Sequence, residues 1–368
     1  MERTGTLYDF AEHKTETSFR AYIEELIEDR GEPVRALTVI SERTPREIFR
    51  DFPLEEYSVS VEDQEIFTTG RLVREIEGGS YEGGSKQFAD NFFIVSHSEE
   101  KLYTIFTVSD KDFFDKALTR FIEILPSEIT GSFLSSEDLR RLIQNFDNRV
   151  NGNLVVKKAV LKSTGEDTQI EYHEEKPYYE VFNEASTSDL YVDKIELTVQ
   201  NTGTAFQFFV SRNGATRFIS GSSDLYFNVL LNSLATFISD KGELFQDRDR
   251  EYGSRDTDPI KIQYEEGSII GVEENKRLIK ALKGIKRTSV TVYHDNPYMH
   301  ASVLDFDDGT SVDVYLTSDS DISIIPGFNA SKKSLSRICD QINKGFLEGE
   351  VKAEEEQERD FDDYFSAA

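Results

Sequence analysis

Four aspartates near the C-terminal end of the chain have the residue type and the spacing of a metal site. They are Asp305, Asp307, Asp308 and Asp313. Carboxylate oxygens are the ligands that Mg²⁺ and Ca²⁺ prefer. Alternation along a strand would place Phe306 and Asp307 on opposite faces, however, and Asp308-Gly309 is a typical turn pair. We therefore predict an acidic hairpin that needs no metal, and we keep a metal-dependent hydrolase as the third functional hypothesis.

Two histidines just before this stretch flank a short loop. Pairing of strands across the loop that begins at Asp295 would set His294 and His300 opposite each other. Two imidazoles and a carboxylate can bind a divalent metal ion. Solvated histidines at the mouth of a hairpin give the same pattern, and we predict this simpler arrangement. We expect neither a metal nor another cofactor.

The sequence lacks the known signatures of catalysis and of nucleotide binding. The glycine-rich run that ends in Ser85-Lys86 does not have the spacing of a phosphate-binding loop, and a strand is expected to follow it. No catalytic serine motif, zinc-protease motif or dinucleotide fingerprint occurs. The single cysteine, Cys339, excludes an internal disulfide and is expected in the core beneath a helix. These observations favour a protein without enzymatic activity.

Basic residues are scarce, yet several of them gather in one short segment. They are Lys276, Arg277, Lys280, Lys283, Lys286 and Arg287. Helical spacing would place four of them on one face, opposite a leucine and isoleucine face: Lys276, Lys280, Lys283 and Arg287. A second stripe on a shorter helix comprises Arg43, Arg46 and Arg50. We predict that both stripes contact a partner, and the alternative is an ordinary solvated helix face.

The formal net charge of −28 is the most unusual feature of the composition. Acidic residues are dense from Glu348 to Asp363, and the remaining excess is spread along the chain. Like charges repel less in concentrated salt, because the Debye length falls to about 3 Å at 1 M. We therefore predict adaptation to high intracellular salt. The alternative is an acidic protein from a mesophilic host that does not accumulate salt.

The longest apolar run is far shorter than the roughly 20 residues that a membrane span needs. No apolar segment of a signal peptide follows Met1. We therefore expect a cytoplasmic protein without a membrane partner.

The predicted strands and helices follow an order that recurs along the chain. We expect α+β units of the plan β-α-β(3–4)-α, because domains average roughly 150 residues and this order repeats. The predicted divisions are a first unit with an N-terminal helix and a helical insert at 1–150, a second unit at 151–247, a linker at 248–259, a third unit at 260–347 and an acidic tail at 348–368. Asn213-Gly214 and Asp308-Gly309 are the predicted hairpin turns.

This element order is similar to that of the TATA-binding-protein-like fold. The resemblance is one of pattern and implies an antiparallel sheet with helices on one face and an open face that meets nucleic acid or protein. Aromatic pairs such as Phe92-Phe93 and Phe208-Phe209 exceed the needs of three small cores. We therefore expect a non-enzymatic binding or adaptor subunit that presents open sheet faces and a basic helix to a protein partner. Direct nucleic-acid binding is the alternative.

The distributed acidity leads to a prediction about salt. If it is a salt adaptation, the thermal unfolding midpoint should rise as KCl increases from tenths of molar to molar, because screening weakens the repulsion between carboxylates. Thermal melts across a KCl series measure this change. A midpoint that stays flat or falls would contradict the adaptation.

Overall fold

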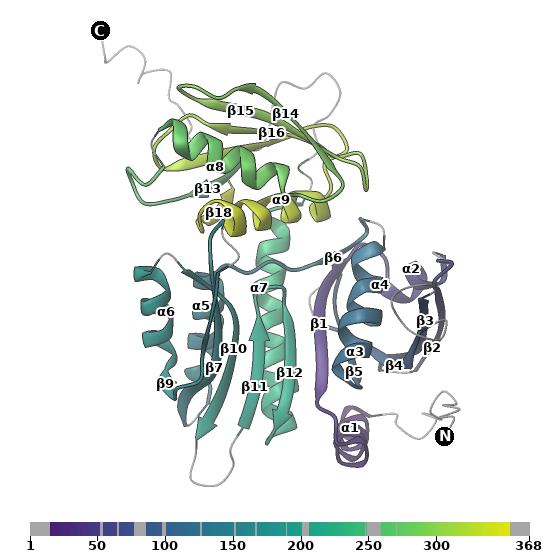
Figure 1. The fold of residues 1–368 in the computed structure, drawn as a ribbon. Helices are drawn as coiled ribbons and strands as arrows, with labels where there is room; N and C mark the ends of the chain where they lie inside the picture. The colour runs from purple at the N-terminus through teal and green to yellow at the C-terminus, as the bar shows by residue number, and fades with distance from the viewer. Residues whose placement is uncertain are drawn as a thin grey trace, which may run out of the picture.

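The chain folds around two antiparallel β-sheets, each packed against helices, and belongs to the α+β class (Figure 1). This computed structural model describes residues 15–51, 54–64, 66–76, 86–97, 101–125, 127–150, 152–165, 168–188, 190–200, 206–246, 248, 259–269 and 271–353. Three predicted features fall wholly or mostly outside these ranges: the glycine-rich loop before Lys86, the linker at 248–259 and the acidic tail beyond Ala353.

The large sheet contains the strands from the first two predicted units. They are β1 (Val34–Ser41), β2 (Tyr57–Asp63), β3 (Thr68–Ile76), β4 (Lys86–Ser96), β5 (Leu102–Val108), β6 (Ile129–Gly131), β7 (Asn153–Ser163), β8 (Gln169–Tyr172), β9 (Lys176–Pro177), β10 (Leu190–Gln200), β11 (Phe206–Ser211) and β12 (Ala215–Ser220). Their order is β2-β3-β4-β5-β1-β12-β11-β10-β7-β8, with β6 also paired to β1 and β9 to β7. Strand β1 therefore joins both halves into one sheet.

Helices cover this sheet unequally. They are α1 (Glu16–Arg30), α2 (Pro45–Asp51), α3 (Lys111–Phe113), η1 (Phe114–Leu118), α4 (Thr119–Ile124), α5 (Ser136–Asp147), α6 (Tyr178–Thr187), η2 (Leu225–Leu231) and α7 (Asn232–Glu243), where η marks a π-helical turn. In β1, Val34 and Ala36 pack on the side of α1, α5, α6 and α7, whereas Leu37 and Val39 pack on the side of α2 and α4. Ala215 of β12 also packs against this second core, but among the described elements no helix contributes to a core on the second side of β7, β10 and β11.

The small sheet and two helices form the C-terminal unit, residues 259–353. Its elements are β13 (Ile260–Gln263), α8 (Val272–Lys283), β14 (Thr288–His294), β15 (Met299–Asp305), β16 (Ser311–Leu316), β17 (Asp321–Pro326), α9 (Lys332–Gly345) and β18 (Glu350–Ala353). The strand order is β14-β15-β16-β17-β13-β18. Both helices pack on one face and lie between the small sheet and the large sheet (Figure 1). Cys339 is fully buried in this core, as predicted.

The Asn-Gly and Asp-Gly pairs correctly predicted the positions of two hairpin turns. The structure confirms the hairpin β11–β12 at Gly214 and the hairpin β15–β16 at Gly309. Both glycines have positive φ, 73° and 79° respectively, which other residues adopt only with strain. The helical insert predicted from Ser136 is α5, which starts with a capping box formed by Ser135 and Asp138.

The pairing of the first strand distinguishes the three segments. In the first and third segments, the first strand pairs with the last of the four strands that follow the helix, as β1 with β5 and β13 with β17. In the middle segment, the first strand is β7, upstream of the strand predicted at Gln169, and it pairs with β10, directly after the helix. A single topology repeated three times is therefore not confirmed. Strand β18 also extends the small sheet into residues that were predicted to belong to the acidic tail.

A buried ion pair joins the large sheet to the C-terminal unit. Arg212, in the turn between β11 and β12, is 2% exposed, and its Nη1 atom lies 2.8 Å from Oε1 of Glu348, which follows α9. The guanidinium carbon lies 4.4 Å from the ring centroid of Tyr191 and 5.3 Å from that of Phe133. The same Glu348 oxygen accepts the backbone N–H of Ser136 at the start of α5. These contacts fix where the two sheets meet.

Replacement of Arg212 by methionine tests the strength of this junction. The change leaves Glu348 partly buried without its cation, and the loss of one partner of a buried pair costs about 3–5 kcal/mol. We expect the free energy of unfolding of Arg212→Met to fall by about that amount in denaturant titrations. Arg50→Met is the matched control, because Arg50 is exposed, and it should change stability by less than about 0.5 kcal/mol. Equal stabilities of the two variants would contradict the role of Arg212.

Candidate functional site

The C-terminal unit turns one face of its small sheet away from the rest of the molecule. In β15, Met299, Ala301 and Val303 are fully buried in the core with α8 and α9. Strand alternation therefore points the intervening residues to the opposite side. We call this surface the outer face, and its residues include Thr291, Tyr293, His300, Ser302, Leu304, Asp313, Tyr315, Ser323 and Ile325. Both helices of this unit lie on the other side of the sheet, so no helix of the described residues covers the outer face (Figure 1).

A row of stacked rings crosses the outer face. His300 lies opposite Tyr315 in the register of β15 and β16, with ring centroids 4.2 Å apart and an interplanar angle of 11°. Tyr293 covers the other side of the imidazole at 4.8 Å and is itself 62% exposed. Nε2 of His300 lies 3.6 Å from a carboxylate oxygen of Asp313. The row therefore presents an aromatic surface with an adjacent negative charge.

The two histidines that flank the loop are opposite each other in the sheet register, as strand pairing requires. A register irregularity between Val292 and His294 places the ring of Tyr293, however, against His300. Within the ranges that the structure describes, no group of three or more histidine, cysteine, aspartate or glutamate residues is arranged to hold a metal ion.

The acidic hairpin is attached to α9 by its carboxylates. Asp305 is 1% exposed and accepts hydrogen bonds from Oγ of Ser334, at 2.6 Å, and from Arg337. Asp307 bonds to Arg337 at 2.8 Å. Asp308 accepts hydrogen bonds from the backbone N–H of Thr310 and from the hydroxyl of Ser334. Burial raises the pKa of Asp308, but the hydrogen bonds to its carboxylate outweigh burial and the pKa is lowered. Three of the four aspartates therefore hold the hairpin against the start of α9.

The basic segment is exposed, but it is not one continuous helical face. Helix α8 ends at Lys283, because Gly284 occupies its C-cap, so Lys286 and Arg287 lie in the turn that follows. The prediction that Arg287 shares the helical face is therefore wrong. Its guanidinium instead bonds to Asp307 at 2.8 Å.

The other basic side chains of this segment differ in their partners. Lys276 pairs with Glu273 at 2.7 Å, and Arg277 donates to the backbone carbonyl of Phe346 at 2.9 Å. No hydrogen bond or ion pair joins the side chains of Lys280, Lys283 or Lys286 to the part of the chain that the structure describes. These three lysines are the cations of the segment whose charge remains available to a partner.

The arginine stripe of the first segment is largely engaged within the fold. Arg43 precedes α2 rather than lying on it, and it pairs with Asp51 at 2.6 Å and Glu128 at 2.7 Å. Arg46 pairs with Asp63. Arg50 is exposed at the end of α2. Helices α2 and α8 do occupy equivalent places, since each follows the first strand of its segment. The available positive charge nevertheless lies on α8 and in the turn that follows it.

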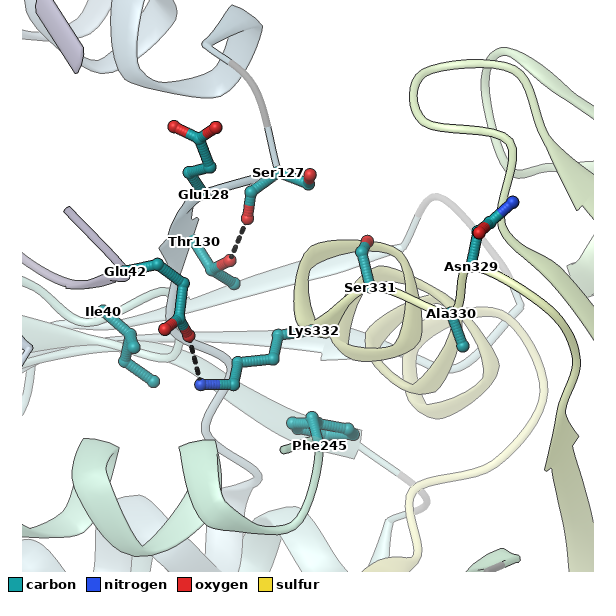
Figure 2. A pocket seen from close by; sticks show the side chains of 10 residues that line it. All are labelled: Ile40, Glu42, Ser127, Glu128, Thr130, Phe245, Asn329, Ala330, Ser331 and Lys332. Carbon is teal, nitrogen blue, oxygen red and sulfur yellow. Dashed lines mark hydrogen bonds and ion pairs between the residues drawn. The ribbon is translucent and has the colours of Figure 1, made fainter. Parts of the chain in front are cut away.

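A small pocket of about 300 Å³ lies where the start of α9 meets the large sheet (Figure 2). Figure 2 shows Lys332 reaching from α9 to the carboxylate of Glu42, above the ring of Phe245. Burial raises the pKa of Glu42, but hydrogen bonds from Lys101 and Lys332 outweigh it and the pKa is lowered. The charges of Glu42 and Lys332 neutralise each other, and their ion pair joins the large sheet to the C-terminal unit at this pocket.

Comparisons with known proteins give no relative on which to base a function. A search against protein-family models finds no match, and no curated protein sequence matches the chain. Within the described part of the chain, no helix has both the length and the apolar composition that are needed to cross a bilayer.

Lys333, next to this pocket, leads to a prediction about pH. It donates to the backbone carbonyl of Leu125 at the end of α4, and burial lowers its pKa from 10.5 to about 8. The folded chain therefore binds fewer protons than the unfolded chain between pH 8 and 10, so stability rises with pH in this window. We expect the free energy of unfolding to increase by about 1–2 kcal/mol more in the native chain than in Lys333→Met between pH 7.5 and 9.5. Parallel pH profiles of the two proteins would contradict this assignment.

Proposed function

We propose that this chain is a non-enzymatic binding protein whose C-terminal unit presents its outer face to a partner protein. The observation that carries the proposal is the grouping of large exposed hydrophobic side chains. Among the described residues, most of those with substantial exposure belong to the C-terminal unit: Val272, Tyr293, Tyr298, Leu304, Phe306 and Phe328. Two of them, Tyr293 and Leu304, lie on the outer face. Aromatic residues at an open surface are typical of protein interfaces.

The distribution of charge supports a protein partner over a nucleic acid. On the outer side of the small sheet, two lysines, Lys261 and Lys352, stand beside three carboxylates, Asp313, Asp321 and Glu350. Two of the available lysines, Lys280 and Lys283, lie on α8, which packs against the other side of the sheet, and Lys286 lies in the turn that follows α8. A nucleic acid stacked on the outer rings would therefore meet no excess of positive charge. A protein surface tolerates this nearly balanced arrangement.

A paired substitution tests the role of the outer face. Tyr293→Ser combined with Leu304→Ser removes two exposed apolar groups without emptying a core position, because these side chains are 62% and 42% exposed. We expect a stoichiometric partner that co-purifies with the tagged native chain from its own host to be lost, with affinity reduced by about tenfold or more. Circular dichroism checks that the fold is retained.

Another pair of exposed apolar residues provides the matched control. Ile170 and Tyr179 are 40% and 53% exposed and belong to the segment that carries β7–β12. Ile170→Ser with Tyr179→Ser should retain the partner. Loss of the partner in both double variants, or in neither, would contradict the proposal. Loss of bound nucleic acid from the outer-face variant alone, with protein partners retained, would favour the nucleic-acid alternative.

A further inference from the structure

A second feature of the junction lies away from the outer face. A cleft of about 620 Å³ opens between the β7–β8 hairpin of the large sheet and the α8–α9 pair of the C-terminal unit. It contains Lys162 from β7, Lys280 from α8 and Lys344 from α9, and we call it the lysine cleft. No carboxylate from the described part of the chain lines it. In a chain with a formal charge of −28, such a concentration of cations is unusual.

Aspartates behind the cleft hold two of its lysines in place. Nζ of Lys162 lies 2.8 Å from Oδ2 of Asp193, and Nζ of Lys344 lies 2.5 Å from Oδ2 of Asp340. Both lysine side chains remain about one-third exposed, at 36% and 33%. The side-chain ammonium group of Lys280 has no ion pair or hydrogen bond with the described residues. The cleft therefore offers one uncompensated cation, Lys280, and two lysines that are already positioned by ion pairs.

The wall of the cleft is closely packed around the amide side chain of Gln341. A Cβ atom added at Gly284 or Gly345 would lie 3.1 or 3.2 Å from Nε2 of Gln341, so these glycines leave room for the amide. The backbone N–H of Gly165 donates to the carbonyl of Lys344 at 3.0 Å, which ties the backbone just after β7 to α9. The lysines are thus presented from two units that contact each other directly.

We propose that the lysine cleft binds a phosphate-bearing small molecule. Lysine ammonium groups bind phosphate as point charges, and three of them from separate elements suit an anion with several oxygens. The volume of the cleft falls within the range of about 300–1,000 Å³ that is typical of small-molecule sites. The ligand would bridge Lys162 of the large sheet and Lys280 of the C-terminal unit. This binding activity is additional to the protein contact through the outer face.

The charge of a neighbouring cleft strengthens the choice of an anion. The other large cleft at this junction has a volume of about 820 Å³ and contains four glutamates against one arginine: Glu137, Arg140, Glu265, Glu348 and Glu350. An anion would be repelled there. The two clefts therefore differ in the sign of their charge although both lie between the same two units, and only the lysine cleft suits phosphate.

Calorimetric titration with inorganic pyrophosphate tests the proposal on the full chain. We expect one site per chain, and we expect Lys280→Gln to weaken binding about tenfold or more through loss of a charged contact. Lys283→Gln is the matched control, since Lys283 lies on the same helix, is exposed and does not line the cleft. It should change the affinity by less than about twofold, because solvent screens a charge outside the site.

Two further measurements separate a built phosphate site from general attraction of anions. Lys162→Gln should also weaken pyrophosphate binding, and citrate, a carboxylate anion, should bind more weakly than pyrophosphate to the native chain. At one pyrophosphate concentration, the thermal midpoint of the native chain should rise more than that of Lys280→Gln, because stabilisation by a ligand increases with its affinity for the folded state. No measurable pyrophosphate binding, or equal effects of Lys280→Gln and Lys283→Gln, would overturn the proposal.

Discussion

The contact between Arg212 and Glu348 determines how the two sheets are joined. A guanidinium with 2% exposure is stable only when its charge is paired, so the turn between β11 and β12 must meet the segment after α9 in one arrangement. The rings of Tyr191 and Phe133 cover the group and fix its orientation. With this contact in place, α9 faces the large sheet and the outer face is left open. The lysine cleft and the neighbouring cleft with four glutamates lie between the same two units and depend on this orientation.

The sequence predicted local structure well where one residue type has a strong conformational preference. The turns at Gly214 and Gly309 and the helix start at Ser135 depend on neighbours within a few positions. Strand pairing in the middle segment was not predicted, because element order does not specify which edges meet. The pairing of β1 with β12 joins residues about 180 positions apart, and nothing in either strand alone indicates its partner.

The candidate sites show the same limit. The position of the basic segment could be predicted, since its lysines are close in sequence, but the helix end at Gly284 changed which of them share a face. The partners of Arg43 and Arg287 could not be predicted, because Glu128 and Asp307 approach only in the folded chain. The lysine cleft was missed for the same reason. Its three lysines come from three elements, and no spacing pattern connects Lys162 with Lys344.

The use of both edges of β1 has a consequence for the order of events during synthesis. One edge pairs with β5, which follows within the same segment, but the other pairs with β12 and β6. When a ribosome has released only the first segment, the edge that β12 later occupies has no partner from that strand. An unprotected strand edge invites pairing with other chains. The formal charge of −28 makes emerging chains repel one another in dilute salt, and this repulsion opposes pairing at the unfinished edge.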